Sequence, residues 1–534
     1  MKSRRIMSWI AAAVLVFSCM GAAGASADDT AETTAAIFEE QVNYDGDNEK
    51  IGGNEDDFLD YDFAVGDFQY YRNDDGETVD IVKYTGTAAN VTLPSTVTDP
   101  GTTEDPTPKV KRVVSMSDAF CDNTTLKTVV IPDGVTYIGD GAFMGCTALT
   151  SVSLPNSVTW IGGEAFSGCY NLPSIALPSG VTSIGYSAFA DCTKLSNVAI
   201  PVSCASIGDS AFENCTNITA VTVSRNVKSL GAAAFRGCTK LASASVAGSA
   251  GVLGSETFKD CGVLSTITLG SGITEIGSGA FQNCKALTAV NIPNTVTAIG
   301  EKAFENCSKL SSVTIPGSVK DFGNYVFRGT KWLANQTSSL VIVNNTLIDG
   351  TKCSGSVTIP ETVVYIAGGA FKNCTGLTSV KIHEYVETIG DYAFLGCTSL
   401  TGVTIPEDVE SVGDYAFGFV ASLNEEEEKD EDYNPVSNFK IVCYAGSKGE
   451  AYATENGFTA EVRAKRVVNY GDVNRSGGEP DNEDLARLQQ YISKWNVRLD
   501  KKAADVTGDG NIDTEDIARL QQALSKWPVP LGRS

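Results

Sequence analysis

Six residues with oxygen-bearing side chains recur at regular intervals near the C-terminus of this chain. They are Asp505, Thr507, Asp509, Asn511, Asp513 and Asp516, at positions 1, 3, 5, 7, 9 and 12 of a loop with Gly510 at position 6. Calcium takes six to eight oxygens at about 2.3 to 2.6 Å, and a glycine permits the sharp turn at position 6 of such a loop. We therefore predict a calcium site, with Asn511 binding through its backbone carbonyl and Asp513 through a water. A metal-free acidic turn is the alternative.

A less regular loop lies 32 residues upstream. Aligning Asp484 with Asp516 leaves one extra residue near Gly478, so this loop has thirteen residues, and the neutral Ser476 replaces an aspartate. Fewer ligand charges weaken calcium binding. We predict a second, weaker or distorted calcium site, whose candidate ligands are Asp472, Asn474, Ser476, Glu479, Asp481 and Asp484.

Each loop precedes an amphipathic helix, and the two helices match on both faces. The apolar faces carry Leu485, Leu488, Ile492 and Trp495 in the first copy and Ile517, Leu520, Leu524 and Trp527 in the second. Such stripes predict two helices packed against each other. The polar faces repeat Glu483, Arg487, Gln490 and Lys494 as Glu515, Arg519, Gln522 and Lys526. They are either ordinary solvated faces or two copies of one binding surface.

Residues 466–534 resemble the dockerin module, which binds a cohesin domain on a scaffoldin and so mounts a secreted protein on a cellulosome-type complex. The resemblance rests on two half EF-hand loops, each followed by one helix. It implies a flanking contact between Tyr470 and the tail residues Pro528 and Pro530. It also implies cohesin contacts through Asn482, Glu483, Arg487, Lys494, Thr514, Glu515, Arg519 and Lys526.

The body of the chain is a repeat. Phenylalanine recurs every 23 residues from Phe120 to Phe327, and the step resumes at Phe371, Phe394 and Phe417. Around each phenylalanine the sequence reads I-P-x-x-V-x-x-I-G-x-x-A-F-x-x-C-x-x-L-x-x-V. A coil of this length cannot bury its apolar positions alone, so stacked coils must share one continuous core. The alternation in L-x-x-V-x-I predicts a short strand, and A-F-x-x-C predicts a short helical or irregular turn.

This repeat resembles the BspA-like leucine-rich repeat, whose members are mostly extracellular binding or adhesion proteins. The predicted fold is an α/β repeat solenoid over residues 67–462, of right-handed type with 23-residue coils, followed by a small all-α calcium-binding module. An insertion at about 330–351 should form a hairpin from Leu340–Val343 and Leu347–Ile348. It is either an irregularity of the solenoid without its own chemistry or a ligand loop. Residues 70–93 and 441–453 should cap the two ends of the solenoid, because terminal coils have only one neighbour.

Fifteen cysteines require an explanation in a secreted chain. Ten of them follow the repeat phenylalanine by three residues, from Cys146 through Cys307 and again at Cys374 and Cys397. Equivalent positions stack, so we predict a buried ladder of reduced thiols that fill space. Disulfides between neighbouring coils are the alternative.

Catalysis is not expected. The only histidine, His383, stands where proline usually follows isoleucine, which indicates an exposed turn residue. This interpretation disfavours a His-based triad, and an H-E-x-x-H zinc site cannot form because no second histidine follows Glu384. A glycosidase could use carboxylates alone, but no unassigned stretch is long enough for a catalytic domain.

The N-terminus predicts secretion. Lys2, Arg4 and Arg5 precede the apolar run Trp9–Met20 and the cleavage-type sequence Ala25–Ala27, so residues 1–27 read as a signal peptide. Residues 28–66 and the loop 421–438 are acidic and predicted to be poorly ordered. The formal charge of -25 disfavours nucleic acid as a partner.

Three functions remain open at this stage. The first is a secreted binding protein whose solenoid recognises a ligand and whose module attaches to a polysaccharide-degrading complex. The second is an adhesion protein that binds host or neighbouring cells. The third is an enzymatic component of the complex.

Overall fold

A computed structural model describes residues 61–465, apart from 104, 248–250 and 422–432, and residues 470–531, apart from 475–478, 494–498 and 526–530. The predicted signal peptide, most of the N-terminal acidic segment and the acidic run at 425–432 lie outside the described residues. No helix in the described ranges is long and apolar enough to cross a membrane.

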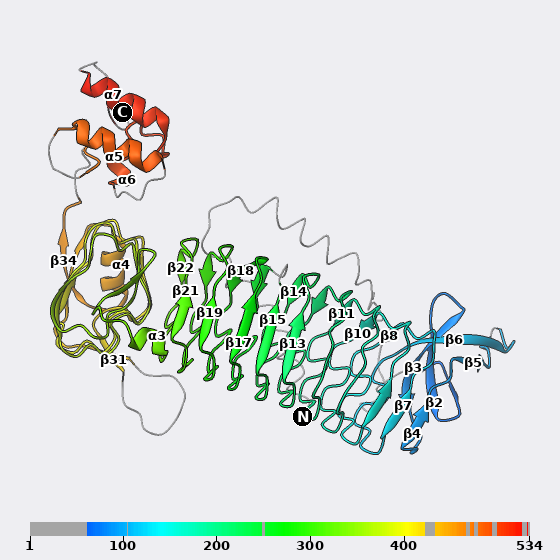
Figure 1. Cartoon of the computed structure of the whole chain (residues 1–534). Helices are drawn as coiled ribbons and strands as arrows, with labels where there is room; N and C mark the ends of the chain where they lie inside the picture. Colours follow the sequence, from blue (N-terminus) through cyan, green and yellow to red (C-terminus); the bar gives the residue numbers. More distant parts are fainter. Residues whose placement is uncertain are drawn as a thin grey trace. The chain divides into compact units, whose positions relative to one another are not determined.

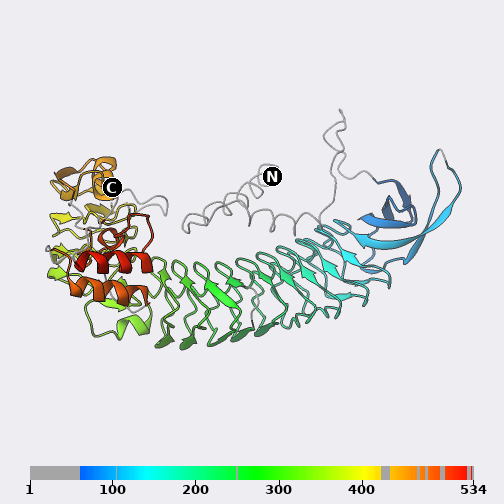
Figure 2. The ribbon, with the colours of Figure 1, turned by 90° about the horizontal axis from the view of Figure 1, so that it is seen from above.

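The repeat forms coils that lie side by side, each giving short strands to two parallel ladders (Figures 1 and 2). The register is fixed by the period: Trp160 pairs with Tyr137 and Ile161 with Ile138, each 23 residues apart. One ladder runs through β8 (Tyr137–Ile138), β10 (Trp160–Ile161), β11 (Ser183–Ile184), β12 (Ser206–Ile207) and β14 (Ser229–Leu230), and a further sheet through β16 (Gly251–Leu253), β18 (Ile273–Ile276), β20 (Ala298–Ile299) and β22 (Asp321–Phe322).

The second ladder follows the predicted L-x-x-V strands. Thr128 pairs with Ser151 and Val129 with Val152, again one period apart. Between the two ladders the chain makes irregular turns, so the alternative of a short helix at A-F-x-x-C is not realised in the regular coils. The strands are β4 (Asn90–Thr92), β7 (Thr128–Val130), β9 (Ser151–Ser153), β13 (Ala220–Val223), β15 (Ser243–Val246), β17 (Thr266–Leu269), β19 (Ala289–Asn291) and β21 (Ser312–Thr314).

The core is a stack of phenylalanine rings. From Phe120 to Phe327, successive ring centroids lie 5.1 to 5.7 Å apart with interplanar angles of at most 12°. Backbone bonds tie the same turns together, as where the Phe143 amide donates to the Ala165 carbonyl at 2.8 Å. Each ring is buried by the coils on both sides, which confirms a shared core within each block of coils. The prediction of a single core is wrong at the interruption, where one cluster ends at Phe327 and a second begins at Leu347.

The cysteine ladder is buried as predicted, and its thiols do more than fill space. Each regular rung donates from Sγ to the carbonyl of the phenylalanine 26 residues earlier; Cys146 bonds to the Phe120 carbonyl at 3.0 Å and Cys238 to the Phe212 carbonyl at 3.3 Å. The cysteines of the described residues are free thiols. Burial raises the pKa of the Cys238 thiol to about 12.

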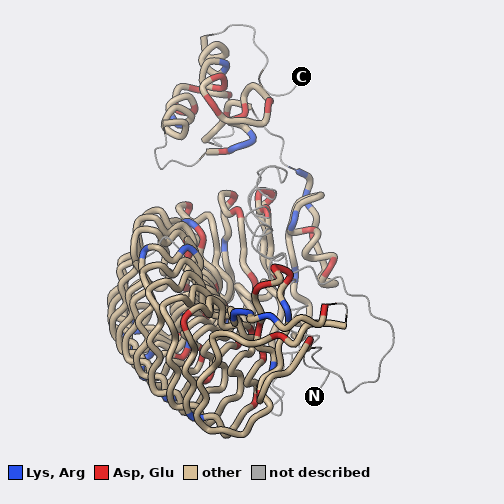
Figure 3. Tube along the Cα trace, turned by 90° about the vertical axis from the view of Figure 1, so that its right-hand side faces the viewer, with Lys and Arg blue, Asp and Glu red and all other residues tan. Residues whose placement is uncertain are grey.

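An ion-pair ladder runs beside the phenylalanines on the surface, where acidic and basic residues are interspersed (Figure 3). Arg236 bonds through Nε to Glu213 at 2.9 Å and pairs through a terminal nitrogen with Glu256 at 2.7 Å, and Lys259 continues to Glu256 at 2.7 Å. These ion pairs are partly buried. Surface ion pairs contribute about 0.2 to 1 kcal/mol each, so these pairs add to a stack that the rings hold together.

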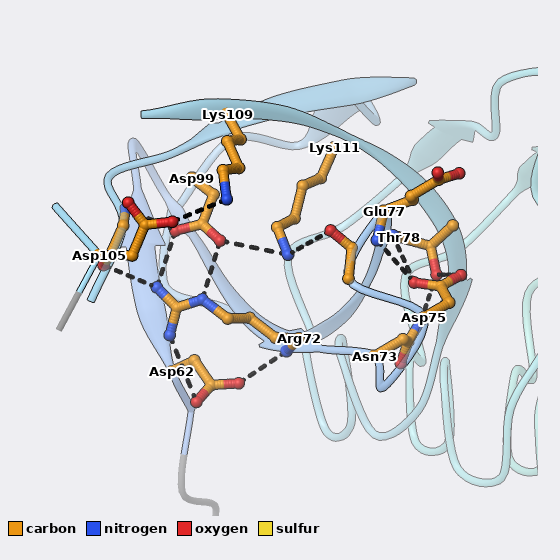
Figure 4. A network of polar contacts seen from close by, with 12 residues as sticks. Asp62, Arg72, Asn73, Asp75, Glu77, Thr78, Asp99, Asp105, Lys109 and Lys111 are labelled. Atoms are coloured by element: carbon orange, nitrogen blue, oxygen red, sulfur yellow. Dashed lines mark hydrogen bonds and ion pairs between the residues drawn. The ribbon is translucent and has the colours of Figure 1, made fainter. Parts of the chain in front are cut away.

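A polar network closes the N-terminal end of the stack (Figure 4). The Arg72 guanidinium binds Asp99 with two bonds of 2.8 and 2.7 Å, and Lys111 donates to the Gly76 carbonyl at 3.0 Å. The hydrogen bonds from Arg72 hold the pKa of the Asp99 carboxyl well below its usual range, although burial opposes them. The cap strands are β1 (Phe63–Val65), β2 (Phe68–Arg72), β3 (Thr78–Tyr84), β5 (Thr96–Asp99) and β6 (Lys109–Met116).

The stack is interrupted after Phe327 by α3 (Lys331–Ala334) and by an antiparallel hairpin, which confirms the predicted hairpin. It consists of β23 (Val341–Val343) and β24 (Thr346–Asp349), and β24 then pairs in parallel with the next coil. The second block comprises β25 (Gly355–Thr358), β26 (Tyr365–Ile366), β27 (Leu377–Lys381), β28 (Thr388–Ile389), β29 (Gly402–Thr404), β30 (Ser411–Val412), β31 (Phe419–Ala421) and β32 (Tyr433–Pro435), closed by β33 (Lys440–Tyr444), α4 (Lys448–Glu455) and β34 (Thr459–Arg463).

The prediction that His383 is exposed is wrong. The side chain is only 7% exposed. Its Nε2 lies 2.7 Å from the Pro360 carbonyl oxygen of the preceding coil, and its Nδ1 accepts from the Tyr385 amide at 3.1 Å. The ring therefore folds inward and links two coils at the position that proline occupies elsewhere in the repeat.

Candidate functional site

The C-terminal module has two helices that begin in the same way, α5 (Asn482–Ile492) and α7 (Thr514–Leu524) (Figure 1). Each starts with a capping box between two aspartates: Asp481 and Asp484 cap α5, and Asp513 and Asp516 cap α7. Carboxylates at a helix start satisfy otherwise unpaired amides and interact favourably with the helix dipole. The acidic residues that end each loop therefore also fix where its helix begins.

A small core joins the helices. Leu488 and Leu520 are fully buried with Val473 and Val506, and a short helix, α6 (Lys501–Ala504), contributes Ala504. Partly buried residues around this core include Leu485, Ile492, Ile517 and Leu524. The predicted packing of the apolar faces is confirmed for these positions, while Trp495 and Trp527 lie outside the described residues.

The second loop turns its oxygens toward its own backbone. Asp505 accepts from the amides of Gly508 and Gly510, at 2.7 and 3.0 Å. Asp516 accepts through Oδ1 from the Thr507 amide and through Oδ2 from the Asp513 amide, both at 2.9 Å. Gly510 has a φ of 94°, a value that L side chains avoid, so position 6 requires glycine.

One oxygen of this loop is buried without a hydrogen-bond partner. It is Oγ1 of Thr507, at position 3 of the loop. A buried hydroxyl without a partner costs free energy, and a hard cation that prefers oxygen ligands satisfies such an atom. The donor set of the second loop thus fits calcium, although no three acidic, histidine or cysteine side chains in the described ranges are grouped closely enough to form a ready metal cluster.

In the first loop the last aspartate, Asp484, accepts the same two backbone hydrogen bonds as Asp516. Asp484 accepts from the Asn474 amide at 3.0 Å and from the Asp481 amide at 2.9 Å, as Asp516 does from Thr507 and Asp513. Asn474 and Asp484 are ten residues apart, whereas Thr507 and Asp516 are nine apart. The extra residue of the first loop therefore lies between Asn474 and Asp484, and the bond that joins them is kept.

Two carboxylates of the first loop are buried. Asp484 is fully buried and Asp472 is 5% exposed, whereas Glu479 is exposed. Burial raises the pKa of the Asp484 carboxyl, and the nearby charges of Asp481 and Asp472 raise it further. Ser476 lies outside the described residues.

The candidate partner surface is duplicated in the described residues. At the helix starts Asn482 and Glu483 are exposed, as are Thr514 and Glu515 at the equivalent places. One turn later Arg487 and Arg519 are both partly buried. The exposure of each pair matches, so the two helices present similar polar faces; Lys494, Lys526, Pro528 and Pro530 lie outside the described residues.

The chain thus combines a solenoid of stacked coils with a small C-terminal module of two loops, each followed by a helix. Comparison with protein families names both parts. The model for the "BspA type Leucine rich repeat region" matches residues 115–242, 240–343 and 341–429, which is more than half of the chain. The chain therefore belongs to the BspA-type leucine-rich repeat family. Its C-terminal residues 470–525 match the "Dockerin type I domain".

Solved structures of other bacterial leucine-rich repeat proteins are similar to this chain. One from Bacteroides ovatus is 24% identical, with a TM-score of 0.48, covering 76% of this chain and 100% of that one. A leucine-rich cell surface protein from Faecalibacterium prausnitzii is 23% identical, with a TM-score of 0.34 and coverages of 77% and 96%. The pneumococcal vaccine antigen PcpA is 17% identical, with a TM-score of 0.39 and coverages of 76% and 98%. No curated protein sequence matches the chain.

The two family assignments set the coarse function. A leucine-rich repeat solenoid is a binding scaffold, a dockerin domain implies attachment to a cohesin, and both are typically non-catalytic. Type I dockerin domains generally bind calcium.

Proposed function

We propose that this chain is a secreted, non-catalytic binding protein that its dockerin domain mounts on the cohesin of a cellulosome-type complex, where its solenoid recognises a ligand. The observation that carries the proposal is the duplicated exposed face behind two oxygen-rich loops. Packing requires that buried positions repeat; it makes no such demand on Glu483 and Glu515 or on Arg487 and Arg519.

Calcium is the cofactor in this proposal. In the second loop it would be held by Asp505, Thr507, Asp509, the Asn511 carbonyl, Asp513 and Asp516, and in the first by Asp472, Asn474, Ser476, Glu479, Asp481 and Asp484. A bound divalent cation offsets the repulsion between buried carboxylates and fixes the loop around them. The protein residues then set the start of each helix through their capping boxes, and so orient the partner face.

The partner face in this proposal is Asn482, Glu483, Arg487 and Lys494 on one helix and Thr514, Glu515, Arg519 and Lys526 on the other. Secretion is supported by the sequence of residues 1–27 and is required for assembly on an extracellular scaffold. The solenoid spans about 67–462 and the module 466–534 in this account.

Capture of the full chain on a panel of immobilised cohesins, first in calcium and then in chelator, tests the proposal. We expect capture in calcium, release in chelator, and no capture of a chain that ends at residue 465. Calcium-independent capture, or capture of the truncated chain, would contradict the role of the module. Release of reducing sugar by the purified chain would contradict the non-catalytic role.

A further inference from the structure

The interrupted coil lacks one ring of the phenylalanine stack. Gly350 stands at the phenylalanine position: its amide donates to the Ala370 carbonyl at 2.7 Å, and its own carbonyl accepts from the Cys374 thiol at 3.4 Å. These are the two bonds that a regular phenylalanine makes. A Cβ on Gly350 would lie 2.3 Å from the Phe371 ring, so no larger residue fits there.

In this coil the turn that joins the strand β24 to the phenylalanine position is two residues shorter than the equivalent turn of the next coil. Leu347 pairs with Ile366 in the strand ladder, and the phenylalanine position follows three residues after Leu347 but five residues after Ile366. A shortened turn leaves space between the turns on either side. That space is a cavity of about 300 Å³, within the usual range for small-molecule sites.

The cavity has apolar walls and a cationic rim. Leu333 and Ile348 line it together with Tyr325, Arg328, Asp349 and Lys372. The Arg328 guanidinium lies 4.3 Å from the centroid of the Tyr325 ring, and the Lys372 ammonium lies 5.8 Å from the same centroid. Arg328 is neutralised by Glu305. Within the described ranges Lys372 forms no ion pair with a carboxylate, and its ammonium also lies 5.8 Å from the centroid of the Tyr392 ring, so it is available to pair with an anionic ligand.

Tyr325 forms one wall of the cavity. Its φ of 59° is shared by the equivalent residues of other coils, such as Lys302 at 55° and Tyr392 at 58°, so this conformation belongs to the repeat. The ring reaches across to the opposite turn, since a Cβ on Gly369 would lie 1.9 Å from it.

A buried carboxylate completes the cavity. Asp349 is 7% exposed, and one of its oxygens accepts from the Thr351 hydroxyl at 2.8 Å. The neighbouring Lys352 donates to the Gln336 carbonyl at 2.5 Å and forms no ion pair with Asp349 in the described ranges, although its charge offsets part of the effect of burial. Burial raises the pKa of the Asp349 carboxyl. A buried acid without a paired cation destabilises the fold, and such a cost is commonly retained where a ligand is bound.

We propose that this cavity binds a small carboxylated sugar unit, a hexuronic acid, whose carboxylate pairs with Lys372 and whose hydroxyls donate to Asp349. The apolar CH face of the sugar ring suits Leu333 and Ile348. Hydroxyl donors bond to Asp349 whether or not it is ionised, whereas the ammonium of an amino acid requires the ionised form. The inference gives a ligand class to the proposed binding role of the solenoid and does not depend on the dockerin domain.

Calorimetric titration of the full chain with galacturonate, glucuronate, glucose and glutamate tests this site. We expect at least one uronate to bind about tenfold or more tightly than glucose, a difference of about 1.4 kcal/mol. Lys372→Gln should weaken that binding by about tenfold or more. Lys259→Gln should leave it unchanged; Lys259 also directly follows a repeat phenylalanine, but in an uninterrupted coil. Asp349→Asn should also weaken it.

Three results would overturn the assignment: no binding of either uronate, equal binding of glucose, or tighter binding of glutamate. Unchanged uronate binding in Lys372→Gln with an unaltered melting temperature would overturn it as well. None of these results affects capture on cohesin, so failure of this site and failure of the proposed attachment are distinguishable. If Asp349→Asn does not fold, the comparison of Lys372→Gln with Lys259→Gln decides.

Discussion

The solenoid and the dockerin domain differ in which of their residue positions recur. In the solenoid the repeated core residues are buried, as Phe212 and Cys215 are, while the partly exposed residue after the phenylalanine changes from Glu213 to Arg236 to Lys259. In the dockerin domain the exposed positions repeat as well as the buried ones.

Stacked coils must repeat their core to bury it, and they also repeat exposed threonines such as Thr159 and Thr182, whose hydroxyls donate to the carbonyl one coil earlier. Glu483 and Glu515 lie on two separate helices rather than in adjacent coils, so stacking does not account for their repetition, and that repetition supports the proposed partner surface.

The largest effect that follows concerns the buried thiols. A pKa of about 12 for Cys238 leaves about one thiolate in ten thousand at pH 8. We expect ladder thiols to react with an aromatic disulfide reagent at least a thousandfold more slowly in the native chain than in denaturant. The half-exposed Cys121 serves as the internal control. Ladder thiols that react as fast as Cys121, or that prove to be disulfides by mass, would contradict the ladder described here.

Removal of one stacked ring should have the next largest effect. Phe212→Ala deletes a fully buried ring between Phe189 and Phe235, and such deletions cost about 3 to 5 kcal/mol of the free energy of unfolding. Thr222→Ala, at an exposed position of β13, should change it by about 0.5 kcal/mol or less. Urea denaturation of both variants measures the difference, and equal losses would remove the distinction between buried and exposed repeats.

A smaller effect is expected in the second loop of the dockerin domain. Thr507→Val removes the buried hydroxyl oxygen and should weaken calcium binding by about tenfold, because one oxygen ligand is lost. Asn511→Ala is the matched control, since position 7 binds through its backbone carbonyl. Calcium titration followed by calorimetry compares the two variants. Equal affinities in both would exclude the Thr507 side chain as a ligand.

The smallest effect concerns the buried acid at the interruption. Because burial raises the folded-state pKa of Asp349, its ionisation destabilises the fold as pH rises above the unfolded-state pKa of about 3.9. Asp349→Asn should therefore raise the melting temperature at neutral pH and increase the free energy of unfolding by up to about 1 kcal/mol. Both gains should disappear below pH 4. Asp133→Asn, at an exposed position, should show no such pH dependence. A gain that persists at pH 3 would point to a cause other than the charge.

Much of the fold and of the candidate site could be predicted from the spacing of residues in the sequence. The 23-residue period determines the stack, the register and the buried rings, because identical positions must meet in adjacent coils. The hairpin at 341–349 followed from the apolar residues on both sides of Asn344 and Asn345. The two loops and their helices followed from oxygen spacing and from the apolar stripes.

Other features depend on contacts that a period does not reveal. Cysteine reads as a small apolar residue, so its bond to a carbonyl 26 residues earlier was not expected. His383 was placed outside because the repeat has an exposed turn there; a polar ring can fold inward when the carbonyl of Pro360 offers a partner. The 44-residue step from Phe327 to Phe371 signals an irregular coil, but only the structure identifies Gly350 as the missing rung.

The proposal that the polar faces of α5 and α7 are two copies of one binding surface is tested most directly by cohesin capture with one or both faces altered. Arg487→Glu changes the first face, Arg519→Glu the second, and the double variant both. If the two faces are alternative copies of one binding surface, each single variant retains capture in calcium and the double variant loses it. Loss of capture in either single variant, or full capture by the double variant, would contradict the account.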